Sequence, residues 1–266
     1  RSASCICLPL EWGWLKTMAS NCSSAGQASC AALPRVSFWA QYKALLVKDV
    51  RMELRTRDMI VSMGVYALLV LTVYGATMSQ TGDAFDILSV AAGLLWAMIV
   101  FTSLLGLNRS FANEVENGCL EGVLLAPVSR AAIYLAKMTS NLLFLCVVEL
   151  IAVPLFFVFF LSGAVLADTT PYIVLPLLVG SIGIAGVGTF LSTMTMDTRG
   201  KDVLLAILFI PVIFPLLYAC VSATSVALLG VEGQMVTFWR SLMLAGGYDV
   251  IMVAAAWGLY EFIVNS

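Results

Sequence analysis

Six long apolar stretches constrain this chain more than any other feature of its sequence. They lie near residues 59–78, 87–107, 138–161, 172–196, 203–229 and 242–264. A helix needs about 20 residues to cross the ~30 Å hydrocarbon core of a bilayer, and each stretch provides that length. The sequence therefore predicts an all-α integral membrane protein with six transmembrane helices. In a five-span alternative, the fifth or the sixth stretch would be re-entrant.

Composition supports the same conclusion. The chain is 61% hydrophobic and 11% charged, with a mean hydropathy of +0.98. A soluble domain needs a largely polar surface and could not bury this much apolar area. Residues 1–34 differ from the rest, because they are rich in Ser, Ala and Cys and contain no apolar run long enough to span. We interpret residues 1–34 as a leader or a gene-start artefact without ordered structure, and residues 35–266 as one transmembrane permease domain.

An amphipathic helix is predicted for residues 38–58, just before the first span. Its apolar stripe consists of Phe38, Tyr42, Leu45 and Leu46, and its basic face of Lys43, Lys48, Arg51, Arg55 and Arg57. Such a helix lies in the membrane interface, with its apolar side in the acyl boundary and its cations against anionic lipid headgroups.

The distribution of Lys and Arg predicts the orientation. Outside residues 1–34, eleven of these residues precede the first span or lie in the connections after spans two and four, whereas the opposite connections hold only Arg240. Cytoplasmic loops carry the excess of Lys and Arg. We therefore expect both termini, and the connection formed by residues 108–130, to be cytoplasmic.

The connection at residues 108–130 is the longest polar interval between spans. Phe111 and Val115 lie four residues apart, which favours a short amphipathic helix. Gly accepts the left-handed backbone that ends helices, so Asn117 and Gly118 are expected to end it. This stretch is either an ordinary connection or a loop that receives force from a soluble partner. In the second case its contact residues would be Phe111, Glu114, Val115, Glu116, Asn117, Gly118 and Glu121.

Small residues recur in the fourth span, where they would let helices approach closely. They are Gly180, Ser181, Gly183, Ala185, Gly186 and Thr189. Tight packing within one subunit and a seam between subunits or at a gate both remain open. In the fifth span, Pro211 and Pro215 remove backbone donors and are expected to form a hinge.

Three acidic residues, Glu149, Asp249 and Glu261, fall within or at the edge of predicted spans, where an ionised side chain costs a few kcal/mol or more. Glu149 is the deeper one, and it is either a protonated carboxyl inside the bundle or a functional group. Asp249 and Glu261 lie nearer the ends of their predicted span. Their carboxyls either reach the interface or, as for Glu149, lie within the membrane.

Several classes of chemistry are absent from the sequence. The chain has no histidine, no phosphate-binding GxxxxGK[ST] motif and no CxxC pair among its 7 cysteines. We therefore expect a non-catalytic subunit that binds neither a metal nor a cofactor directly, and no nucleic acid as a partner.

The run of residues 104–156, LLGLNRSFANEVENGCLEGVLLAPVSRAAIYLAKMTSNLLFLCVVELIAVPLF, resembles the CcmB family of the cytochrome c maturation system. Asp197-Thr198-Arg199, the Pro211/Pro215 pair and Tyr248-Asp249-Val250 are similar to CcmB as well. The resemblance covers about residues 42–264. The layout also resembles the membrane subunits of type-2 ABC exporters.

The resemblance implies a bacterial inner-membrane permease subunit, a homodimer within its complex. Its partners would be an ABC ATPase like CcmA, membrane proteins like CcmC and CcmD, and a haem chaperone like CcmE. ATP would act through the ATPase subunit to release the haem-loaded chaperone, and haem is a possible substrate.

Two other functions remain open. The chain could be an ABC permease that exports a lipid, glycan or drug. It could also be an ion-coupled transporter that uses Glu149, although such transporters usually have inverted repeats with broken helices, and the two three-span halves show none.

Overall fold

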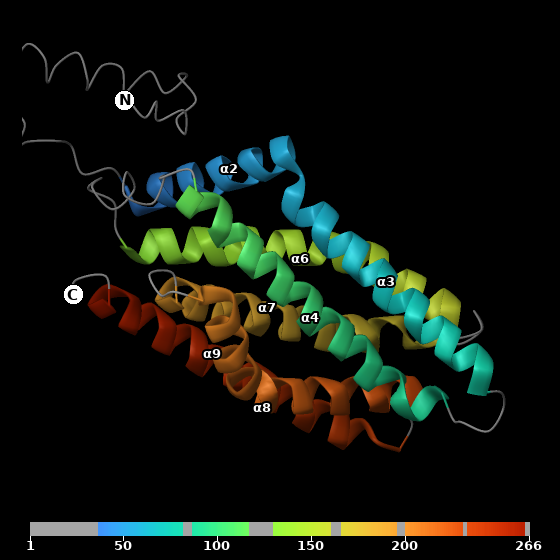
Figure 1. The fold of residues 1–266 in the computed structure, drawn as a ribbon. Coiled ribbons are helices and arrows are strands. Elements are labelled where there is room, and N and C mark those ends of the chain that lie inside the picture. Colours follow the sequence, from blue (N-terminus) through green and yellow to red (C-terminus); the bar gives the residue numbers. More distant parts are fainter. Residues whose placement is uncertain are drawn as a thin grey trace, which may run out of the picture.

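The computed structural model describes residues 37–81, 87–116, 130–160, 166–195, 200–230 and 233–263. Within these residues every regular element is a helix (Figure 1). The helices are α2 (Phe38–Thr56), α3 (Asp58–Thr81), α4 (Ile87–Glu116), α6 (Arg130–Phe160), α7 (Leu166–Thr195), α8 (Lys201–Leu229) and α9 (Met235–Ile263). The predicted leader, residues 1–34, lies outside the described residues.

Six of these helices, α3 to α9, are long and apolar enough to cross a membrane. The prediction of an all-α protein with six spans is thus confirmed, and the five-span alternative is wrong. Several helices extend beyond their predicted spans: α4 continues to Glu116, α6 begins at Arg130 and α9 begins at Met235. Hydropathy detects only the part of a helix that matches the hydrocarbon core, whereas backbone hydrogen bonding continues into the polar flanks.

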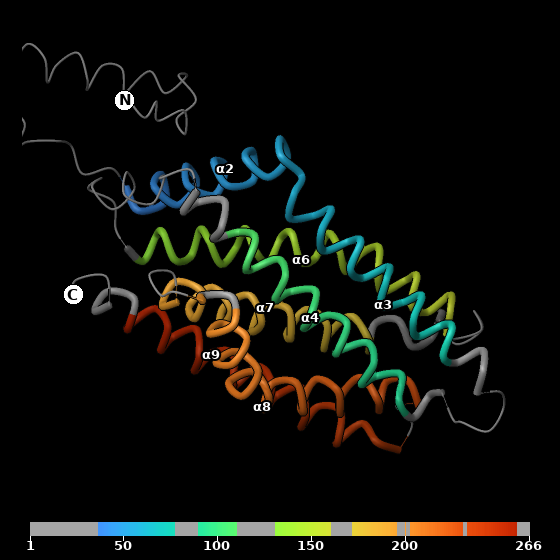
Figure 2. The backbone as a smooth tube through the Cα atoms, viewed as in Figure 1, coloured from blue at the N-terminus to red at the C-terminus, as the bar shows by residue number. Residues whose placement is uncertain are grey.

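Helix α7 is the centre of the bundle, because it contacts α4, α6, α8 and α9 (Figure 2). Its small residues permit this, since each neighbour reaches the α7 backbone at close range. Large side chains from the surrounding helices fill the remaining space, among them Trp96, Phe156, Phe209 and Phe238, all of which are fully buried.

Helix α2 lies against α6 at one end of the bundle and joins α3 through a sharp elbow (Figure 1). Arg57 forms the elbow in a left-handed conformation, with φ of 60°, and its backbone N–H donates to the Glu53 carbonyl at 2.6 Å. The Glu53 carboxylate then accepts hydrogen bonds from the backbone N–H groups of Met59 (2.7 Å) and Ile60 (3.1 Å). Glu53 therefore caps the N-terminus of α3, where the unpaired donors and the helix dipole favour an anion.

The side of α2 that packs on the bundle differs from the expectation, because it carries acidic side chains and not only the apolar stripe. Asp49 and Glu53 are its buried residues, and Tyr42 points to α6, where its hydroxyl donates to Thr139 Oγ1 at 3.1 Å. Trp39 and Leu54 are instead exposed, at 67% and 60%. Amphipathicity alone could not reveal this, because the partners of these carboxylates lie outside α2: backbone N–H groups at the start of α3 for Glu53, and Lys137 of α6 for Asp49.

Candidate functional site

Two acidic side chains meet the central helix α7 at nearly the same height. Glu149 of α6 contacts Ser181, and Asp249 of α9 packs at Gly183. Ser181 and Gly183 are two residues apart, which is roughly 3 Å along a helix and about 200° around it. The carboxyl groups of Glu149 and Asp249 thus flank α7 from opposite sides.

The Glu149 carboxyl is held by a serine hydroxyl. Ser181 Oγ lies 2.8 Å from both carboxyl oxygens and 2.7 Å from the Leu177 carbonyl oxygen. A hydroxyl has one proton, so it donates to only one of these three acceptors at a time. A proton on Glu149 would let the carboxyl donate to Ser181 Oγ while Ser181 donates to Leu177. The geometry therefore accommodates a neutral Glu149, in keeping with the interpretation of a protonated carboxyl inside the bundle.

Asp249 lies far deeper than its sequence position indicates. Of its two interpretations, the buried carboxyl agrees with the structure, because Asp249 is the midpoint of α9, which begins at Met235, and is only 6% exposed. The first turns of α9 contain the polar residues Thr237, Arg240 and Ser241, and Gln234 precedes them. These residues lower the local hydropathy, so the sequence-based prediction started this span too late. Asp249 Oδ1 has no hydrogen-bond partner among the described residues.

Shape holds Asp249 in place. A Cβ added at Gly183 would overlap both the Asp249 carboxyl and the Leu216 side chain of α8. The missing side chain of Gly183 thus creates the recess that Asp249 and Leu216 share. Three helices, α7, α8 and α9, meet at this recess.

The two prolines of α8 belong to the same junction. Pro211 and Pro215 both lie inside α8, and the neighbouring Val212 carbonyl accepts a hydrogen bond from the Tyr248 hydroxyl of α9. Leu216, which follows Pro215, enters the Gly183 recess. Prolines remove backbone donors, so this part of α8 has fewer internal bonds and is held instead by α9.

The other small residues of α7 contact helices of the same chain. Gly180 faces Trp96 of α4, whose indole N–H donates to Thr224 Oγ1 of α8 at 3.0 Å. The Gly186 carbonyl accepts from the Tyr134 hydroxyl at 3.1 Å, and Thr189 Oγ1 accepts from the Asn141 amide at 3.0 Å. Ala185 is buried as well.

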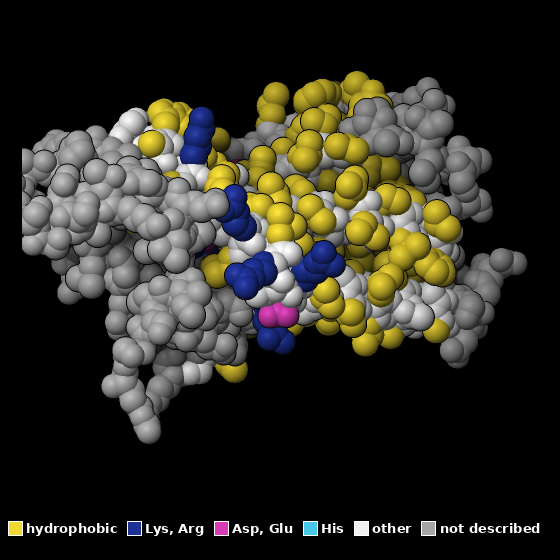
Figure 3. Space-filling model, turned by 90° about the horizontal axis from the view of Figure 1, so that it is seen from above, with side chains coloured by type: hydrophobic (Ala, Val, Ile, Leu, Met, Phe, Trp, Pro, Cys, Tyr) yellow, Lys and Arg dark blue, Asp and Glu magenta, His cyan; other side chains and the backbone are white. Residues whose placement is uncertain are grey.

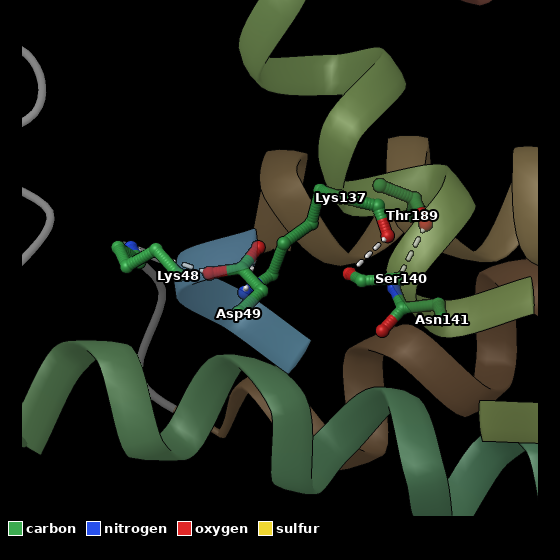
Figure 4. A network of polar contacts seen from close by, with 6 residues as sticks. All are labelled: Lys48, Asp49, Lys137, Ser140, Asn141 and Thr189. Atoms are coloured by element: carbon green, nitrogen blue, oxygen red, sulfur yellow. Dashed lines mark hydrogen bonds and ion pairs between the residues drawn. The ribbon is translucent and has the colours of Figure 1, made fainter. Parts of the chain in front are cut away.

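A second polar network joins α2, α6 and α7 near the end of the bundle (Figure 4). Lys137 extends from α6 towards Asp49 of α2, with 3.9 Å between Nζ and Oδ2, and both side chains are buried. One turn further along α6, Asn141 donates to Thr189 of α7. Lys48 lies 3.3 Å from the other Asp49 oxygen. These contacts connect the interfacial helix to the central helix through side chains on α6.

The predicted ATPase-contact stretch is only partly described. Phe111, Glu114, Val115 and Glu116 fall in the last turns of α4, which is one continuous helix from Ile87. The prediction of helix up to Glu116 therefore holds for the backbone, but as the end of a spanning helix and not as a separate short one. Asn117, Gly118 and Glu121 lie outside the described residues.

Sequence reasoning missed Asp49, Glu53 and Asn141, and it did not anticipate that Lys137 is buried. One signal was present: Asp49 and Glu53 are four residues apart, and hence on one face, in a helix whose other charges are basic. Asn141 follows Lys137 by four residues, so these two polar side chains also share one face of a helix.

Among the described residues, no group of three or more His, Cys, Asp or Glu side chains could hold a metal ion.

Comparison with known proteins identifies the family. A family model described as CcmB protein matches residues 40–258. The chain belongs to the CcmB family. The matched residues run from α2 to α9, so both membrane carboxyls, the Gly183 recess and the Asp49–Lys137 pair lie within the CcmB match.

The chain is also similar to several proteins named heme exporter protein B. The one from Pseudomonas aeruginosa is 25% identical over 218 residues, which is 82% of this chain and 96% of the relative. Those from Rhodobacter capsulatus and Paracoccus denitrificans are 26% identical over 175 residues and 27% over 176, in each case 66% of this chain and 78% of the relative. The resemblance to CcmB that residues 104–156 indicated is thereby confirmed, and it extends over most of the chain.

Proposed function

We propose that this CcmB-family chain is the membrane subunit of a haem-handling complex for cytochrome c biogenesis in the bacterial inner membrane. The observation that carries the proposal is the family match, which extends through all six spanning helices. The relatives' names supply haem as the cargo. In this proposal the chain is not an enzyme, and ATP hydrolysis occurs on a separate CcmA-like subunit.

The remaining partners are those of the family: CcmC-like and CcmD-like membrane proteins, a CcmE-like haem chaperone and a second copy of this chain. The excess of Lys and Arg in alternate connections supports cytoplasmic termini. Cysteine labelling in a cysteine-free background tests this orientation. Positions near Glu116 and Lys201 should be protected in intact cells, whereas positions near Asp83 and Asp168 should react.

Helix α4 offers a route from the ATPase to the bundle centre. It is continuous from Ile87 to Glu116, and Trp96 lies about 30 Å from Glu116 at 1.5 Å per residue. Trp96 packs on Gly180 of α7. A displacement at the Glu116 end would therefore be transmitted along a rigid helix to the central helix. The proline-containing part of α8 is the hinge in this proposal, because Pro211 and Pro215 each remove a backbone donor.

The function is tested by complementation. The gene should restore c-type cytochromes, detected by haem staining, in a bacterium that lacks its own heme exporter protein B but retains the other subunits. Co-purification should recover the ATPase. Recovery of an ATPase without restored cytochromes would instead favour an ABC permease for another substrate.

The ATPase contact is tested by charge reversal. Glu116→Lys should lower ATPase co-purification roughly tenfold, as expected when a contact charge becomes repulsive. Gly118→Val should act in the same direction by penalising a left-handed backbone. Arg240→Glu, on the opposite predicted face, is the matched control and should leave association unchanged. Equal association of all three variants, at equal membrane abundance, would show that residues 108–130 are only a connection.

A further inference from the structure

A groove of about 480 Å³ opens beside the elbow between α2 and α3, outside the site described above. Its polar end consists of Thr56, Arg57, Asp58 and Ser62. Its other end follows α3 away from the elbow and is mainly apolar, with Tyr66 as its one residue that carries a polar side-chain group. The groove therefore has the polarity of an amphiphile.

The apolar part has the shape of a channel for a chain. Val61, Val65 and Leu69 recur every four residues along one face of α3, over roughly 12 Å at 1.5 Å per residue. Leu105 of α4 forms the opposite wall. These side chains remain 55%, 60%, 56% and 36% exposed, so the protein itself does not fill the groove. A length of 12 Å approaches the thickness of one hydrocarbon leaflet, about half of ~30 Å.

The position of the groove matches the depth of a lipid headgroup. The first membrane-spanning stretch begins at Asp58, so the polar end of the groove lies where hydrocarbon gives way to headgroups. Figure 3 shows Lys and Arg side chains gathered over α2 and its junction with α3, and apolar side chains over α3. The elbow is also well fixed, because Glu53 binds both Arg57 and the start of α3.

The charges at the polar end select between headgroups. Arg57 and Asp58 are adjacent and exposed, and neither forms an ion pair within the described part of the chain. A ligand with one anionic group and one primary ammonium group would pair with both, because an ammonium N–H donates to a carboxylate, whereas the trimethylammonium group of choline has no N–H to donate. A purely anionic lipid would satisfy Arg57 but face the Asp58 carboxylate. The two propionates of haem would meet the same carboxylate.

We propose that this groove binds a phospholipid whose headgroup carries a phosphate and a primary amine, such as phosphatidylethanolamine. The phosphate pairs with Arg57, the ammonium group pairs with Asp58, and one acyl chain lies along Val61, Val65 and Leu69. The lipid would thereby occupy the angle between the interfacial helix and the first span.

The test uses the full chain in phosphatidylcholine vesicles that contain a trace of acyl-chain spin-labelled lipid. Electron paramagnetic resonance measures the motionally restricted fraction for labelled phosphatidylethanolamine, phosphatidylglycerol and phosphatidylcholine. Phosphatidylethanolamine should bind roughly two- to fivefold more tightly than the others, as expected of an exposed ion pair. Equal association of the three lipids would overturn the proposal.

Two headgroup variants assign the contacts. Arg57→Asn removes the cation while retaining a residue type that accepts the left-handed backbone. Asp58→Asn removes the anion. Both should abolish the preference for phosphatidylethanolamine, whereas Arg55→Gln, a nearby exposed cation outside the groove, should not. A preference for phosphatidylglycerol that Arg57→Asn removes and Asp58→Asn leaves intact would overturn the amine assignment.

A groove variant assigns the acyl chain. Val65→Trp fills the channel and should reduce the restricted fraction of phosphatidylethanolamine, whereas Ile207→Trp, at a similarly exposed position on α8, should not. Displacement of the labelled lipid by haem would reassign the groove to haem. Cross-linking between copies through Val65→Cys, together with a loss of restricted lipid, would reassign it to a subunit interface. Both results would overturn the proposal.

Discussion

The contacts of α2 with α6 and α3 at the end of the bundle, and the α7–α9 contact at its centre, both bury acidic side chains, but by different means. At the end of the bundle, Asp49 lies near Lys137, and Glu53 binds backbone N–H groups of α3. At the centre, Asp249 has no ion pair within the described residues and occupies the recess at Gly183. The comparison shows that partners hold the carboxylates at the end of the bundle, whereas helix shape holds the carboxyl at its centre.

The largest expected effect is at the recess. Gly183→Val would place atoms where the Asp249 carboxyl and Leu216 now lie, and overpacking of this kind costs roughly 1–3 kcal/mol or more. Thermal unfolding of the purified protein in detergent would measure the loss. Gly246→Val in α9 is the matched control, because an added Cβ there meets nothing within 4 Å.

A second variant distinguishes the contribution of Asp249 at the recess from that of Leu216. Asp249→Ala should recover part of the stability lost in Gly183→Val, since the two positions compete for the same space. If Gly183→Val is no less stable than Gly246→Val, then shape does not hold Asp249, and the contrast with α2 fails.

The next effect is at the ion pair. Lys137→Met retains a long apolar side chain but leaves Asp49, only 7% exposed, without this cation. The loss should be about 2 kcal/mol, less than for an isolated buried pair because Lys48 also lies near Asp49. Asp49→Leu combined with Lys137→Met should recover most of it. If the double variant is as unstable as Lys137→Met, then the unpaired charge of Asp49 does not cause the loss of stability in Lys137→Met.

The spans could be predicted because about 20 apolar residues in succession have few other uses. The contacts between spans could not. Every face of such a helix is apolar, so the pattern does not show that Glu149 turns towards Ser181 or Asp249 towards Gly183. The depth of Asp249 was misjudged because the polar residues near Arg240 hid the first turns of α9.

The interfacial helix shows the opposite limitation. Its amphipathicity predicts the helix itself, and α2 is present at Phe38–Thr56. Its buried side, however, carries Asp49 and Glu53, whose partners lie on other helices. A hydrophobic pattern assigns carboxylates to the outside unless their partners are known.

A smaller effect is expected at the elbow. Glu53→Ala removes the cap of α3 and should lower the free energy of unfolding by about 0.5–2 kcal/mol, the range for N-cap residues. Glu53→Gln keeps an oxygen acceptor for Met59 N–H and Ile60 N–H and should cost less. Thermal unfolding distinguishes the two. Equal losses would show that the negative charge at the helix terminus, and not the hydrogen bonds, provides the stabilisation.

The smallest effect is expected at Glu149. If shape and neutral hydrogen bonds hold carboxyl groups in the centre of the bundle, an amide should replace the carboxyl with little change. Glu149→Gln retains the side-chain length and an oxygen that can accept from Ser181, so its unfolding free energy should stay within about 0.5 kcal/mol of the parent. Thermal unfolding and c-type cytochrome yield are measured together.

The two readouts for Glu149→Gln separate structure from function. Normal stability with normal cytochrome yield would extend the comparison to Glu149, because a neutral group then suffices on both sides of α7. Normal stability with a lost yield would mean that the carboxyl must release its proton during turnover. An amide cannot do so, and the Glu149–Ser181 contact would then belong to an ion-coupled step and not to the static packing of the bundle.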